Sequence, residues 1–186
     1  ISACLVGSEM CKETDSEDYK GLEDFGNFLN EIGDSSASTY LNSAAALSNG
    51  MQQLYQSNLD NGSNYLNQSG FTWSWFQSSG PGWMDNPITL YPDGTAQVFP
   101  QLYRVPLPSY MYADGWNFLR QNFDFESPCG SSCDPWSSLG LAAAYNGDNS
   151  TANVMLTNTR NTGGTPIHEW GFYRRTVLYQ EYGFIY

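Results

Sequence analysis

The chain has 186 residues and a formal net charge of -12, with 7 lysines and arginines against 19 aspartates and glutamates. Nucleic-acid phosphates and anionic membrane surfaces repel so acidic a protein, so neither is an expected partner. No apolar run approaches the roughly 20 residues that span a bilayer. The length fits one domain, 1–186, with a core of its own and no membrane span.

The two ends of the chain differ in composition. All 6 tryptophans and 23 of the 29 aromatic residues lie beyond Gly70, and no lysine follows Lys20. Residues 1–70 carry ten acids against two lysines. We therefore predict an α+β fold, in which an acidic helical part (1–70) forms a hairpin packed on an antiparallel, aromatic-rich β-sheet (71–186).

A first helix is predicted from about Ser16 to Gly33. The segment 14–17 has the pattern of a capping box, with acids where the helix dipole favours them. Gly33 stands where a left-handed residue would end the helix. The apolar stripe recurs at intervals of three and four residues, at Tyr19, Leu22, Phe25, Leu29 and Ile32.

A second helix is predicted to begin with an N-cap within 35–38 and to run toward a stop signal at 60–62. Its apolar positions continue the helical period, at Tyr40, Ala44, Leu47, Met51, Leu54 and Tyr55. Gly50 interrupts it at a cost of about 1 kcal/mol relative to alanine, so we expect a kink or a close contact there.

Beyond Gly70 the apolar period changes from about 3.6 to 2, which indicates strands. Apolar and polar residues alternate over 71–75. A hairpin is predicted from 88–91 and 95–99, since Pro92, Asp93 and Gly94 between them favour a turn. Further strands are predicted over 154–157 and 172–182. The segments 56–69 and 146–162, rich in Asn and Ser, are predicted as surface loops.

The cysteines indicate an oxidising compartment. They form two close pairs along the chain, Cys4 with Cys11 and Cys129 with Cys133. We interpret them as disulfides, in any of three pairings, because a zinc site would need ligands nearer than His168. The first residue is Ile1 rather than Met, so we expect a removed leader and a secreted or cell-surface protein.

The catalytic signals point only to paired carboxylates. No nucleophile elbow, phosphate loop or dinucleotide fingerprint occurs. Glycoside hydrolysis needs only two acids, for which Glu169 beside His168 is the first candidate. Asp114, or the segment 124–126 with its two acids, would supply the second. The alternative is that these acids are solvated and that His168 is structural.

Two kinds of ligand site are considered. Exposed indoles would stack on sugar rings, although a second half with few aliphatic residues would also use them as core. The candidates are Trp73, Trp75, Trp83, Trp116 and Trp136. The oxygen-rich segment 145–150 would suit calcium, although ordinary turns use the same residues. Glycosylation sequons begin at Asn61, Asn67 and Asn149.

The segment 177–186 is apolar and aromatic to its last residue. We expect it to be covered, and a sheet without lysine lacks a common protection of its edge strands. The leading hypothesis is an exported structural subunit that assembles with copies of itself through a sheet edge or this strand into a filament or surface layer. The alternative is a secreted glycan-binding protein or glycoside hydrolase that uses Glu169. A third hypothesis is a secreted effector.

Overall fold

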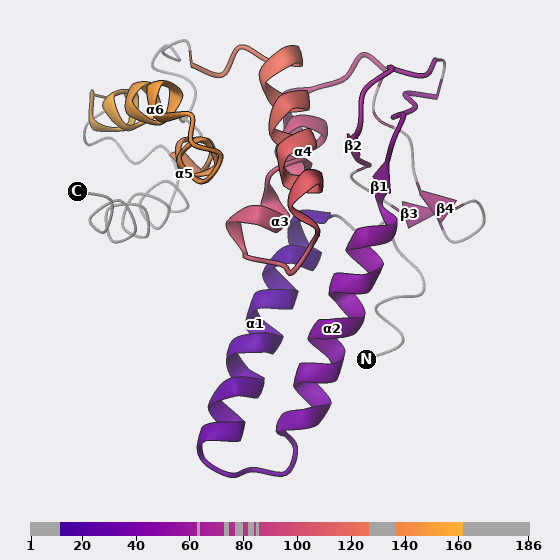
Figure 1. Cartoon of the computed structure of the whole chain (residues 1–186), viewed down its shortest axis with the longest axis vertical. Coiled ribbons are helices and arrows are strands. Elements are labelled where there is room, and N and C mark those ends of the chain that lie inside the picture. Colours follow the sequence, from indigo (N-terminus) through magenta and orange to yellow (C-terminus); the bar gives the residue numbers. More distant parts are fainter. Residues whose placement is uncertain are drawn as a thin grey trace. The chain divides into compact units, whose positions relative to one another are not determined.

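The computed structural model describes residues 12–62, 64–72, 75–76, 80–81, 84, 86–126 and 137–161. The described part is mostly helical, with an N-terminal helical hairpin and very short antiparallel strand pairs (Figure 1). Contacts between residues divide the chain into two compact units, Ile1–Asn122 (unit 1) and Phe123–Tyr186 (unit 2).

The hairpin is formed by α1 (Lys12–Glu31) and α2 (Ala37–Gln53), which pack against each other. One face of α1 carries the seam, in which Tyr19, Gly26 and Leu29 are buried. Gly26 lets α2 approach closely, because a Cβ there would lie 2.8 Å from the Leu41 side chain. The predicted hairpin of helices is therefore confirmed.

The loop between the two helices is closed by local capping. Gly33 has φ +75, the left-handed conformation predicted for the end of the first helix. The Asp34 carboxylate then accepts hydrogen bonds from the backbone N–H of Ser36, at 2.8 Å, and from its hydroxyl, at 2.7 Å. These two bonds lower the pKa of Asp34.

Both helices deviate from their predicted limits. The segment 14–17 lies inside α1 rather than at its start, so the capping-box prediction was wrong. Ser16 is fully buried, and its hydroxyl contacts the Met51 sulfur at 3.5 Å. The second helix ends at Gln53, before the predicted stop, because Tyr55 turns into a strand.

The strands of unit 1 are two residues long. β1 (Tyr55–Gln56) pairs antiparallel with β2 (Gly70–Phe71), and β3 (Trp75–Phe76) pairs antiparallel with β4 (Gly80–Pro81). The segment between β1 and β2 is irregular apart from a bridge between Asp60 and Tyr65, in accord with the predicted loop. The predicted strand near residues 71–75 is therefore replaced by parts of two small pairs.

The hairpin predicted over 88–99 was wrong. This segment contains a π-helical turn, η1 (Leu90–Gly94), and then α3 (Phe99–Leu102). The cause is the buried Asp93, whose carboxylate accepts the Thr89 N–H at 2.8 Å and so closes the turn. Backbone N–H groups in a two-stranded ladder pair with backbone carbonyls. A turn that a side-chain acceptor closes therefore does not fit the predicted hairpin.

The long helix α4 (Ser109–Asn122) follows a proline-containing connection and was not predicted. Its signal lies in the sequence, because its buried residues recur with helical period, at Met111, Gly115, Trp116, Phe118 and Leu119. The Tyr112 hydroxyl donates to the Val105 carbonyl and accepts the Leu107 N–H, which holds the preceding connection against α4.

The core of unit 1 lies where the base of the hairpin meets the first strand pair and the segment before α4. It brings together residues that are far apart in the chain: Tyr19, Ala44, Met51, Leu54, Phe71, Val105, Leu107 and Met111. Figure 1 shows that the opposite end of the hairpin, with its loop, extends beyond α3 and α4. Among the described elements of unit 1, the distal half of α1 packs against α2.

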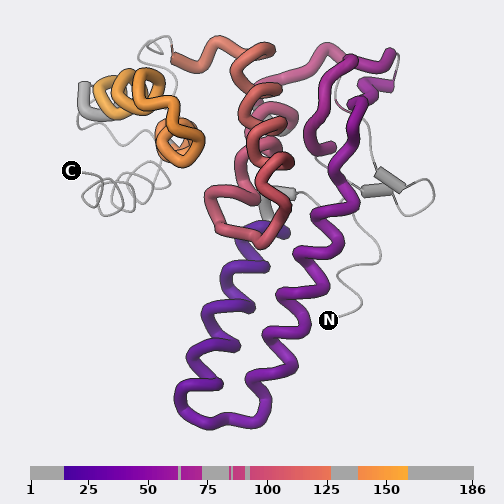
Figure 2. Tube along the Cα trace, in the orientation of Figure 1, coloured from indigo at the N-terminus to yellow at the C-terminus, as the bar shows by residue number. Residues whose placement is uncertain are grey.

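The described helices of unit 2 are α5 (Ser137–Tyr145) and α6 (Asn149–Asn161), which pack together (Figure 2). The strand predicted over 154–157 and the loop predicted over 146–162 were wrong, since α6 occupies most of that segment. Ala152, Met155 and Leu156 are buried in a helical pattern, which only this packing reveals. The predicted strand over 172–182 lies outside the described residues.

Candidate functional site

Most of the predicted site residues fall outside the described part of the chain. This holds for Glu169 and His168, for Trp73, Trp83 and Trp136, and for Cys4, Cys11, Cys129 and Cys133. For Trp75 the structure describes the backbone alone, in β3. The carboxylate-pair and disulfide hypotheses therefore stay predictions.

Asp114 lies on α4 and accepts a hydrogen bond from the hydroxyl of Tyr55 at 2.5 Å. Burial raises the pKa of Tyr55, and the bond to Asp114 raises it further. The bond joins β1 to α4 across the edge of the core. In this position Asp114 ties two elements together.

Tyr110, one helical turn before Asp114, extends this cluster toward solvent. Its ring is 54% exposed and meets the ring of Tyr55 edge-on, with centroids 5.6 Å apart. An exposed aromatic ring beside a carboxylate has the chemistry of a sugar-stacking site. Neither tyrosine was predicted as a site residue, because their proximity depends on how β1 lies against α4 in the fold.

Trp116 does not offer such a surface. It lies on α4 and is only 6% exposed, so its indole belongs to the interior of unit 1. Trp116 is therefore a core residue, and we remove it from the candidate stacking residues.

The oxygen-rich segment 145–150 forms a helix cap. Asp148 accepts hydrogen bonds from the Thr151 N–H at 3.2 Å and the Ser150 hydroxyl at 2.9 Å, at the start of α6. The Thr151 hydroxyl lies 3.0 Å from both Asp148 Oδ2 and Glu126 Oε1, and its single proton serves one of them at a time. Over the described residues, no group of three or more His, Cys, Asp or Glu side chains is placed to hold a metal.

The predicted glycosylation residues all lie in described segments. Asn67 and Asn149 are exposed, and Asn61 is half-buried. Asn149 begins α6, where the third residue of its sequon, Thr151, is buried by the cap. Use of these sequons stays a prediction.

The largest exposed apolar feature of the hairpin is a second stripe on α1, next to the one that packs on α2. We call Gly21, Phe25 and Phe28 of α1, together with Ile32 directly after its last residue, the outer stripe; they are spaced four, three and four residues apart. Phe25, Phe28 and Ile32 are 45%, 53% and 61% exposed. The Phe25 ring stacks with Phe28 and meets Tyr40 of α2 edge-on at 4.8 Å.

This spacing is that of a packing seam. Helices in bundles contact a neighbour through residues three and four apart, and a helix with two such seams contacts two neighbours. In α1 the inner seam faces α2, whereas the outer stripe is exposed over its distal half. The sequence pattern predicts a single stripe that contains Phe25, Leu29 and Ile32. In the structure Leu29 belongs to the inner seam, whereas Phe25 and Ile32 belong to the outer stripe.

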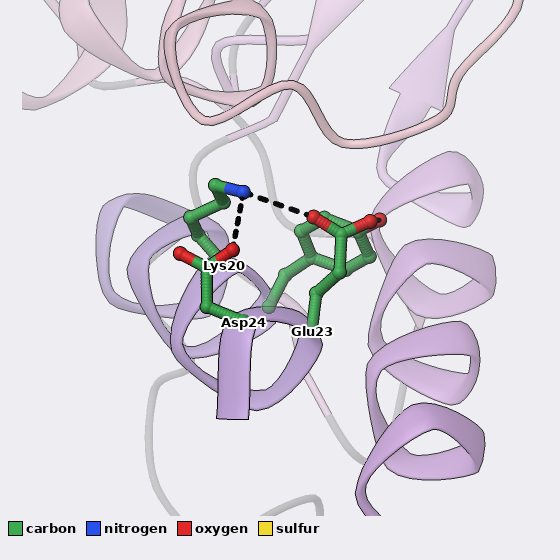
Figure 3. Close-up of polar contacts among 4 residues, drawn as sticks. Lys20, Glu23 and Asp24 are labelled. Atoms are coloured by element: carbon green, nitrogen blue, oxygen red, sulfur yellow. Dashed lines mark hydrogen bonds and ion pairs between the residues drawn. The ribbon is translucent and has the colours of Figure 1, made fainter. Parts of the chain in front are cut away.

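Acidic side chains border the outer stripe. Asp24 and Glu31 stand seven residues apart beside it, whereas Glu17, one repeat toward the N-terminus, accepts a hydrogen bond from the Tyr103 hydroxyl at 2.6 Å. Lys20 donates to Asp24 at 2.7 Å and to Glu23 at 3.1 Å, as Figure 3 shows. Its bond to Asp24 raises the pKa of Lys20. The outer stripe is thus an apolar surface bordered by acidic side chains, and Lys20 beside it is bonded to acids of its own helix.

Comparison of the chain with known protein families, with curated proteins and with solved structures found no match. None of the helices within the described ranges is long and apolar enough to cross a membrane.

Proposed function

We propose that the protein is an exported, extracellular structural subunit that acts by associating with copies of itself. The observation that carries this proposal is the outer stripe of α1, three large apolar side chains exposed in a row on a projecting hairpin. Full burial of a side chain of this size contributes about 1.5–3 kcal/mol, and because these three residues are 45%, 53% and 61% exposed, roughly half of that remains to be gained in a contact.

The proposed contact surface is a helix face, whereas the sequence leads us to expect a sheet edge. The described strands are two residues long and offer little edge for strand addition. A larger aromatic sheet, with a strand over 172–182, stays part of the proposal for residues outside the described ranges. Export is supported by the four cysteines, which form two close pairs along the chain.

The test is sedimentation velocity of the full chain over a wide concentration range. We expect a concentration-dependent shift from monomer to larger species, and Phe28→Ser weakens it by about tenfold or more. Serine and phenylalanine have similar helix propensities and position 28 is exposed, so the variant folds.

The matched control is Tyr65→Ser, which removes an aromatic ring that is 66% exposed and lies outside the hairpin. It should leave association unchanged. A chain that stays monomeric at every concentration and salt level overturns the proposal.

Glycan binding is a second candidate, favoured by the exposed Tyr110 ring beside Tyr55 and Asp114. A glycan array with the full chain, followed by titration of any hit against Tyr110→Ala, tests it. Binding that survives this substitution places the site elsewhere, and an array without hits removes this candidate.

A further inference from the structure

The occupant of the outer stripe follows from charge. Residues 12–53 carry eight acids against Lys12 and Lys20, so two hairpins packed stripe to stripe would bring like charges together. A good occupant instead combines apolar side chains with basic ones.

One segment of this chain has that composition. In the 170–186 segment, ten of the seventeen residues are apolar or aromatic. This segment contains the adjacent residues Arg174 and Arg175 and a single acid, Glu181, whereas the whole chain has only five arginines. Its sequence is thus complementary to the outer stripe in both charge and hydrophobicity.

We infer that the outer stripe of one copy receives the 170–186 segment of another, with Arg174 and Arg175 facing Asp24 and Glu31. This inference rests on the proposed self-association and names the two surfaces that meet. Asp24 and Glu31 lie seven residues apart, about 10 Å along the helix, and two adjacent arginine side chains that leave an extended backbone on opposite sides are long enough to reach one acid each. Because each copy carries one stripe and one segment, two copies can exchange segments in a closed dimer, or copies can join head-to-tail into rings or filaments.

The first arm of the test reverses the charges in the full chain. Asp24→Arg with Glu31→Arg, or Arg174→Glu with Arg175→Glu, should each lower the association constant by about tenfold. Combining all four substitutions should restore it to within about threefold of the original value. Circular dichroism checks that each variant keeps its helix content.

The second arm locates the contact. A photo-crosslinking benzoylphenylalanine replaces Phe28 in a mixture of isotope-labelled and unlabelled chains, and trypsin then cleaves after Arg175. We expect cross-links from position 28 to residues 176–186 that join a labelled chain to an unlabelled one.

The other outcomes are distinct. Cross-links between copies that join α1 to α1, or charge reversals that fail to restore each other, overturn this inference and leave self-association standing. Cross-links to 176–186 within one copy only, in a chain that sediments as a monomer, overturn both the inference and the proposed function.

Discussion

The side-chain amide of Gln97 pairs with both backbone groups of Phe71. Its Oε1 accepts the Phe71 N–H at 2.8 Å, and its Nε2 donates to the Phe71 carbonyl at 2.7 Å. Nε2 also donates to the Asp93 carbonyl at 2.9 Å, and Gln97 is only 1% exposed. One buried side chain thus does for β2 what a neighbouring strand would do, and it fixes η1 against the core.

The first prediction concerns this pairing. Gln97→Glu keeps the shape of the side chain but removes the amide donor to two buried carbonyls and places an ionisable carboxyl at a buried position. Each buried polar group left unsatisfied costs about 1–3 kcal/mol, and a charged group costs more. We expect a loss of stability of that order per carbonyl, measured by urea denaturation. Gln121→Glu, at an exposed position of α4, is the control and should stay within about 0.5 kcal/mol. Equal effects would contradict the role given to Gln97.

The second prediction compares two helix glycines. A Cβ at Gly115 would lie 2.5 Å from the backbone oxygen of Gln97, whereas a Cβ at Gly50 would meet no described atom within 4 Å. The close contact expected at Gly50 is therefore not found among the described residues, and Gly50→Ala should stabilise the protein by about 1 kcal/mol. Gly115→Ala should destabilise it by about 1–3 kcal/mol despite the same gain in propensity. Thermal unfolding of the two variants measures the difference, and shifts of the same sign would contradict it.

The third prediction is a loss of stability at alkaline pH. Burial raises the pKa of Tyr19, Tyr55 and Tyr112, and hydrogen bonds to Glu23 and Asp114 add to the effect for the first two. Tyrosines in the unfolded chain have a pKa of about 10, so the folded state binds these protons more tightly. The stabilisation is full below about pH 10 and is lost as the pH rises through the folded-state pKa values.

Urea denaturation from neutral to alkaline pH measures this decline. Absorbance of tyrosinate should rise later in the folded protein than in the urea-unfolded chain. Tyr19→Phe should make the decline shallower, because it removes one of the raised groups. A free energy of unfolding that stays constant through this range would contradict the assignment.

The fourth prediction concerns the cap of α6. Asp148→Ala removes the acceptor of the Thr151 N–H and should destabilise the start of α6 by about 1 kcal/mol. Hydrogen exchange of the first-turn amides of α6 measures the loss locally. Thr157→Ala, at an exposed position of the same helix, should leave their exchange rates unchanged. A similar acceleration in both variants would show that the effect is not due to the cap.

The candidate surfaces could be predicted only in part. The apolar residues of α1 were visible in the sequence, but the division into an inner seam and an outer stripe required the position of α2. The cluster of Tyr55, Tyr110 and Asp114 joins residues 59 positions apart through one hydrogen bond, and no local pattern indicates that bond.

Local sequence patterns predict the helical hairpin and its left-handed end at Gly33, because helix periodicity and glycine conformation are local properties. In contrast, tertiary contacts determine that residues 90–94 form a π-helical turn and residues 149–161 a helix. The turn depends on Asp93 and Gln97, which use buried side chains to satisfy distant or neighbouring backbone groups. An alternating pattern of residues favours a strand, but a buried polar side chain that replaces the strand partner outweighs it.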